Sequence, residues 1–164
     1  MATQRGWRHC ELCSNMFHGG SSILAGSCAG GDPGDRHVGQ GFEFRLVHED
    51  GPEELSTQRN WFRCRNCSSM FFLAGDGNAG ICITGDPHDG TGSENFHLLH
   101  DVPEEPFFQG DWRFCLNCHV LFFGPEPGGG VCVAAPVQGG PHLPQGFIFV
   151  LKHGTEFTPT SGTL

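Results

Sequence analysis

Nine cysteines are the residues of this chain whose spacing could do chemistry, and they fall into three sets of three. Each set has a C-x-x-C pair and one further cysteine, which follows after 15, 15 and 14 positions. The sets are Cys10, Cys13 and Cys28; Cys64, Cys67 and Cys82; Cys115, Cys118 and Cys132. Three thiols cannot all pair as disulfides within a set, but they can supply three of the four ligands of a tetrahedral zinc ion. Iron–sulfur clusters are the main rival for such thiolate-rich sites.

Two sets of histidines could provide the fourth ligand. The nearer set lies in loops rich in Gly, Pro and Asp, and consists of His37, His88 and His142. The farther set consists of His48, His100 and His153, each four residues after a phenylalanine. In a strand, a residue at that spacing shares the apolar face, where a histidine is usually a packed core residue. We therefore predict three Cys3His sites completed by the nearer set, with the farther set as the alternative.

Sites of this kind are closed, and a closed zinc site is structural rather than catalytic. The sequence thus predicts about three structural zinc ions per chain, one for each set of cysteines. A structural zinc ion contributes about 10–16 kcal/mol of binding free energy that becomes folding free energy. Such support suits a chain with 26 glycines, the residue whose ordering costs the most entropy.

The residues around the cysteines repeat with them. A tryptophan stands three residues before the first cysteine of each set, at Trp7, Trp61 and Trp112, and the sets are 54 and then 51 residues apart. The chain therefore reads as one domain of three repeats, over residues 1–55, 56–107 and 108–164. We call these unit 1, unit 2 and unit 3.

Abundant glycine and 11 prolines favour short strands and tight turns over helices. In unit 2 we predict four strands, over 60–63, 70–73, 80–83 and 95–99. Three such units give an all-β chain of about twelve strands, closed by pseudo-threefold symmetry in a β-trefoil-like fold. A β-prism and three independent zinc beads are the alternatives. Short linkers and 15 phenylalanines favour one shared core.

The composition argues against several partners. A net charge of −9 disfavours nucleic acid and anionic lipid, both of which need a basic surface. No apolar run approaches the roughly 20 residues of a membrane span, so we expect no membrane insertion. The first residues carry no apolar signal segment, so we expect a cytoplasmic protein, or one released without a signal peptide.

The units resemble a tandem repeat found in bacterial and fungal proteins, which reads roughly W-R-x-C-x-x-C-x-x-L-F-F-x-G, then G-V-C, then a Gly-rich loop with a histidine. Residues 112–124, and 80–82 with His88, carry the resemblance, which covers nearly the whole chain. It implies zinc-binding repeats with no catalytic residues to transfer. Unit 1 departs from the pattern at His18, where the other units have Phe72 and Phe123.

These observations favour a non-catalytic binding module, most concretely a lectin, because threefold β proteins often present one shallow glycan site per repeat. The Gly-Asp-Pro loops offer carboxylates for sugar hydroxyls, and the candidate ligand-binding residues are Asp32, Asp35, Asp86 and Asp89. The same loops are also typical of plain β-turns. No hydrolase, zinc-protease or P-loop motif is present, so we expect no enzyme activity. A protein–protein interaction scaffold or a defence protein is the alternative function.

Overall fold

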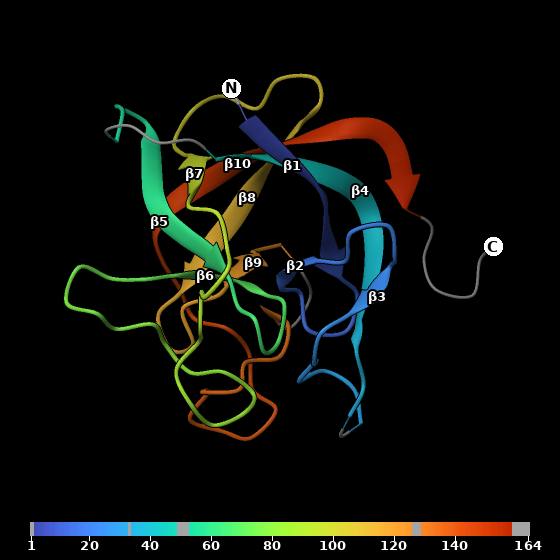
Figure 1. Cartoon of the computed structure of the whole chain (residues 1–164), viewed down its shortest axis with the longest axis vertical. Coiled ribbons are helices and arrows are strands. Elements are labelled where there is room, and N and C mark those ends of the chain that lie inside the picture. Colours follow the sequence, from blue (N-terminus) through green and yellow to red (C-terminus); the bar gives the residue numbers. More distant parts are fainter. Residues whose placement is uncertain (1, 33, 49–52, 126–128, 159–164) are drawn as a thin grey trace.

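The computed structural model describes residues 2–32, 34–48, 53–125 and 129–158, and these form ten strands around one core (Figure 1). The predicted all-β class is confirmed. The strands are β1 (Ala2–Cys10), β2 (Met16–His18), β3 (Leu24–Ala25), β4 (His37–His48), β5 (Thr57–Arg63), β6 (Met70–Phe72), β7 (Phe96–Leu99), β8 (Phe108–Cys115), β9 (Leu121–Phe123) and β10 (Pro144–Thr158).

Within each unit, the first strand pairs antiparallel with two others. Strands β1, β5 and β8 pair with the short strand after the C-x-x-C turn, which is β2, β6 or β9, and with the last strand of the unit, which is β4, β7 or β10. The tryptophan has the same two kinds of partner each time: Trp7 faces His18 and Phe44, Trp61 faces Phe72 and Phe96, and Trp112 faces Phe123 and Phe149. The repeated sequence pattern therefore produces a repeated strand register.

The three units close into a ring because they pair with one another at both ends. At one end the last strands meet: β4 pairs with β7 and β10, and an isolated bridge joins His100 to Phe149. At the other end the segments after the C-x-x-C turns meet through three bridges, Asn15 to Phe122, Phe17 to Ser69 and Phe71 to Val120. The result is a nearly closed, barrel-like sheet in which every unit touches both others.

One core cluster is shared by the units, and each contributes the same four positions. Its buried members are Trp7, Met16, Phe44, Leu46, Trp61, Met70, Phe96, Leu98, Trp112, Leu121, Phe149 and Leu151. Each tryptophan meets the phenylalanine of the next unit edge to face, with ring centroids 5.3 Å apart for Trp7 and Phe96. This shared core matches the closed architecture predicted from sequence and excludes three independent zinc beads.

The predicted third strand of each unit is mostly absent. Residues 80–83, 130–133 and the corresponding 26–29 of unit 1 lie outside any strand, and unit 1 has only the two-residue β3 just before this segment. The loop turns instead toward the next unit: Val131 donates its backbone N–H to the carbonyl oxygen of Cys13 at 3.1 Å. Backbone groups that bond across a unit boundary are not available to a sheet within the unit.

Glycine makes this close approach possible. Gly26, Gly80 and Gly130 each adopt a left-handed φ, between 67° and 72°. A Cβ atom at these positions would overlap the carbonyl oxygen of the second cysteine of the next unit's C-x-x-C pair. The loop before each third cysteine therefore packs directly on the neighbouring C-x-x-C turn.

Candidate metal centres

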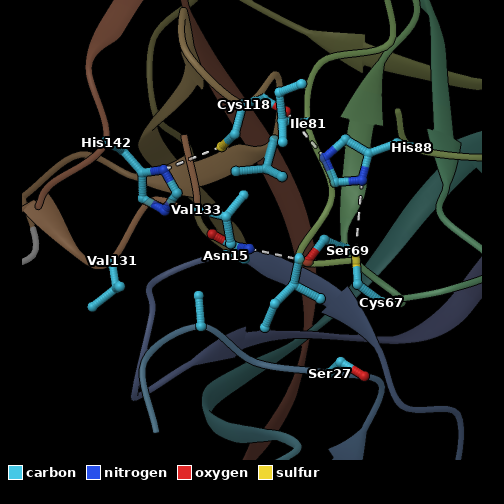
Figure 2. Close-up of a pocket in the computed structure, with 13 residues that line it drawn as sticks. Asn15, Ser27, Cys67, Ser69, Ile81, His88, Cys118, Val131, Val133 and His142 are labelled. Atoms are coloured by element: carbon cyan, nitrogen blue, oxygen red, sulfur yellow. Dashed lines mark hydrogen bonds between the residues drawn. The ribbon is translucent and has the colours of Figure 1, made fainter. Parts of the chain in front are cut away.

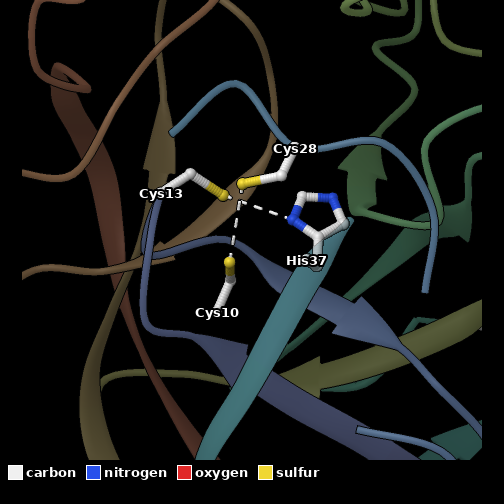
Figure 3. Close-up of side chains that lie close together, drawn as sticks. All are labelled: Cys10, Cys13, Cys28 and His37. Atoms are coloured by element: carbon white, nitrogen blue, oxygen red, sulfur yellow. Dashed lines mark hydrogen bonds between the residues drawn. The ribbon is translucent and has the colours of Figure 1, made fainter. Parts of the chain in front are cut away.

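Each unit gathers its three cysteines and its nearer histidine into one buried cluster. In unit 1, Cys10 ends β1, Cys13 lies in the following turn, Cys28 comes from the loop and His37 begins β4; Figure 3 shows the four side chains converging. All twelve predicted metal ligands are placed in this way, in the clusters Cys10, Cys13, Cys28 and His37; Cys64, Cys67, Cys82 and His88; Cys115, Cys118, Cys132 and His142. Within each cluster the ligand atoms lie within 4.8 Å of one another.

The spacing of the ligand atoms fits zinc. The Sγ atoms of the first and third cysteines are 3.7, 3.9 and 3.7 Å apart in units 1, 2 and 3. The Sγ atom of the second cysteine is 3.4, 3.7 and 3.5 Å from the histidine Nδ1 atom. A tetrahedral zinc ion with Zn–S bonds of about 2.3 Å places its sulfurs about 3.8 Å apart. The chain thus has three structural zinc sites, as predicted.

Backbone geometry around the C-x-x-C pair directs both thiols inward. Ser14, Ser68 and His119, each directly after the second cysteine, have φ between 67° and 71° and so reverse the chain tightly. Backbone N–H groups also face the sulfurs. In the turn, Leu12 donates to the Cys10 Sγ atom at 3.4 Å, and in the later loop Gly30 donates to the Cys28 Sγ atom at 3.3 Å. Such donors stabilise the thiolate form that a metal requires.

The thiols of one cluster differ in acidity before a metal binds. Burial, aided by hydrogen bonds with Cys115 and Cys132, raises the pKa of the Cys118 thiol well above its usual value. Hydrogen bonds with Cys118 and Cys132 lower the pKa of the Cys115 thiol. Because zinc binds the thiolate form, metal binding releases the thiol protons.

Each ligand histidine also joins its own metal site to the next unit. The Nδ1 atom faces the cluster, while the Nε2–H group donates to the carbonyl oxygen of the second cysteine in the following C-x-x-C pair. The distances are 3.0 Å from His37 to Cys67, 3.0 Å from His88 to Cys118 and 3.1 Å from His142 to Cys13. These bonds fix the tautomer that ligates through Nδ1, and they form a closed cycle through all three sites.

A phenylalanine stacks on each of these histidines and orients its ring. The ring centroids are 5.0 Å apart for Phe17 and His37, with an interplanar angle of 23°. Phe71 and His88, and Phe122 and His142, repeat the arrangement. The apolar residue after each C-x-x-C pair therefore positions a ligand as well as filling space.

The three C-x-x-C turns meet at a small cavity of about 10 Å³, bordered by Asn15, Ser69 and Val120 at equivalent positions of the units. Figure 2 shows Asn15 and Ser69 beside this cavity. Asn15 donates its Nδ2–H to the Ser69 hydroxyl at 3.0 Å. Its Oδ1 atom is buried and has no hydrogen-bond partner among the described residues. At the equivalent position, unit 3 has the apolar Val120 and so buries no unpaired oxygen there.

We expect Asn15→Val to stabilise the protein by about 1 kcal/mol, because it removes a buried carbonyl that lacks a partner. Val120 shows that a β-branched residue is accommodated at this position, and Ser69 keeps its hydrogen bond with the His37 Nε2 atom at 3.2 Å. The melting temperature of the zinc-loaded variant would rise. A fall would show that the Asn15–Ser69 hydrogen bond outweighs the unpaired oxygen.

The farther histidines lie away from the metal clusters. His48 faces Glu94, with 3.3 Å between its Nδ1 atom and a carboxylate oxygen, and His100 faces Asp101 at 2.9 Å. His153 is buried, its ring is stacked on Phe42 at 3.7 Å, and its Nδ1 bonds the Gly154 carbonyl. These three histidines pack at the junctions between units.

The four candidate aspartates serve the loops that carry the third cysteine and the histidine. Asp35 accepts the backbone N–H of Asp32 at 2.9 Å, and Asp89 accepts both the N–H and the hydroxyl of Thr91. The backbone carbonyls of Asp35 and Asp86 accept the N–H groups of Cys28 and Cys82. Asp32 and Asp86 have exposed side chains. The structure thus gives the loops a turn-forming role.

A pocket that the sequence did not indicate lies between units 2 and 3. It has a volume of about 170 Å³ and is lined mainly by four phenylalanines and two glutamines, Phe72, Phe114, Phe147, Phe149, Gln58 and Gln145. These residues are scattered over both units, so local motifs could not reveal the site. The sequence signal for this pocket comes only from a comparison of equivalent positions in the three units. That comparison shows where phenylalanines in one unit replace charged residues in another.

Comparison of the chain with protein-family models, curated proteins and solved structures found no match. Within the part of the chain that the structure describes, no helix has the length and apolar character of a membrane span.

Proposed function

We propose that this protein is a non-catalytic binding module for carbohydrate, held in shape by its three zinc ions. A zinc ion with four protein ligands has no coordination position left for water or substrate, which supports a structural role for the metal. The ligand site must then lie elsewhere on the ring of units.

The observation that carries this proposal is the pocket between units 2 and 3. Sugar recognition needs aromatic surface for the C–H face of the ring and amides or carboxylates for the hydroxyls. The pocket offers both, with Phe147 41% exposed and the amides of Gln58 and Gln145 beside it. The metal clusters, by contrast, are buried.

A glycan array with the zinc-loaded protein tests the proposal. We expect binding to a restricted set of glycans, and we expect the matching free sugar at millimolar concentration to displace it. Binding to a protein partner that free sugar does not displace would favour the scaffold function instead. An array without any bound glycan would contradict carbohydrate recognition.

A further inference from the structure

We propose that the pocket between units 2 and 3 is an acetamido-sugar site, which selects the N-acetyl group of a neutral amino sugar. This inference rests on the proposed carbohydrate function and specifies its ligand. It begins with a comparison of the three junctions between units, which are built from equivalent positions but differ in chemistry.

The position two residues before the last-strand phenylalanine shows the difference most clearly. It is Phe147 in unit 3, Glu94 in unit 2 and Phe42 in unit 1. Each contacts a farther histidine: Phe147 stacks on His100 at 3.7 Å, Phe42 stacks on His153 at the same distance, and a carboxylate oxygen of Glu94 lies 3.3 Å from the His48 Nδ1 atom. The junction of units 1 and 2 therefore carries a carboxylate where the other two carry an aromatic ring.

The two aromatic junctions differ in whether their glutamine amide has a hydrogen-bond partner. In the junction of units 3 and 1, Gln40 bonds its amide nitrogen to the Nδ1 atom of His9 at 3.0 Å. In the junction of units 2 and 3, Gln145 takes the place of Gln40 and lies opposite Phe114, whose side chain cannot form a hydrogen bond. The amide of Gln145 therefore has no partner among the described residues and is available to a ligand.

A second amide lies in the same pocket. Gln58 accepts a hydrogen bond from the Trp61 indole N–H at 3.0 Å through its Oε1 atom, and no described residue uses its amide donors. The phenylalanine rings form perpendicular pairs, with interplanar angles of 84° between Phe72 and Phe114 and 89° between Phe147 and Phe149. The pocket thus combines aromatic walls with two primary amides.

An acetamido group matches this combination. Its methyl group is apolar and fits among the phenylalanine rings, while its N–H and C=O groups can pair with the glutamine amides. None of the pocket's lining residues is charged. Asp101 is a nearby carboxylate, because its Oδ1 accepts the backbone N–H of Ile148, the residue between the lining Phe147 and Phe149, at 3.4 Å. Acidic sugars are therefore disfavoured, and the net charge of −9 adds to their exclusion.

The test is saturation-transfer NMR and calorimetry on the zinc-loaded full chain, with N-acetylglucosamine and glucose as the probes. We expect N-acetylglucosamine to bind at least about tenfold more tightly, with the strongest saturation on its methyl protons. Phe147→Ala and Gln145→Ala should each weaken binding by about tenfold, and both variants should keep three zinc ions. Because Gln145 is exposed, its variant remains informative if Phe147→Ala fails to fold.

Glu94→Ala is the matched control, since Glu94 occupies the equivalent position in the neighbouring junction, and it should bind N-acetylglucosamine as the unchanged protein does. Equal affinity for glucose and N-acetylglucosamine would overturn the acetamido inference and leave carbohydrate binding intact. Full binding by both pocket variants would place the site elsewhere and overturn it as well. Failure to bind any glycan on the array would overturn both proposals.

Discussion

Removal of zinc by a strong chelator is expected to unfold the whole chain in one transition, with no stage in which single units unfold. Each structural zinc contributes about 10–16 kcal/mol, whereas a domain of this size has a net stability of about 5–15 kcal/mol. The loss of one ion is thus enough to unfold the protein. Each ligand histidine also bonds to the C-x-x-C turn of the next site, so a disrupted site releases its neighbour.

Elemental analysis should find three zinc ions in the folded protein and none after chelation. Near-ultraviolet circular dichroism follows the collapse directly, because Trp7, Trp61 and Trp112 are all fully buried in the shared core. During a zinc titration of the reduced, metal-free chain, native mass spectrometry should show chiefly species with no zinc and with three. Abundant one- and two-zinc species would contradict the coupling between sites. His100→Ala serves as a control and should retain all three ions.

Gly80→Ala is expected to destabilise the protein by about 2–5 kcal/mol although it leaves every metal ligand in place. Two costs add: the left-handed φ of 72° disfavours a side chain, and the new Cβ overlaps the Cys118 carbonyl oxygen. The overlapping group at Cys118 is backbone and cannot rotate away as a side chain could, so the unit 2 loop must move away from unit 3. The melting temperature and the zinc affinity of the variant would both fall.

Gly77→Ala separates the two costs. Gly77 has a φ of 89°, but a Cβ atom at this position would have no heavy atom within 4 Å, so only the backbone cost of about 1–2 kcal/mol applies. The difference between the two variants measures the packing between units. Equal losses in both would show that this packing contributes little to stability.

The sequence predicted the metal sites well because their information is local. Cysteine spacing and a histidine in the following loop lie within one unit, and three copies of the pattern reinforce one another. The nearer histidines join the cysteine clusters, whereas His48, His100 and His153 lie on or beside the last strands, which meet at the junctions between units. Short linkers and 15 phenylalanines also predicted the shared core.

The contacts between units could not be predicted from the same sequence patterns. The acceptors for His37, His88 and His142 are backbone carbonyls, which every residue possesses, so no residue type marks them. The predicted strand over 80–83 failed for this reason, because its alternating sequence packs across a unit boundary. The pocket between units 2 and 3 depends on Phe114 and Gln145, whose roles emerge only when the equivalent positions of the three units are compared. No local motif marks these residues.

The hydrogen bond from His142 to Cys13 spans 129 residues of sequence and completes the cycle. A ribosome adding about 5–20 residues per second needs roughly 6–26 s to make that stretch. During this time the thiols of the first unit are already synthesised, while their site lacks the loop of unit 3 that packs on its turn. Zinc must therefore bind the thiols of unit 1 before an oxidant reacts with them. A chain that ends before unit 3 would be left with reactive thiols and an open core.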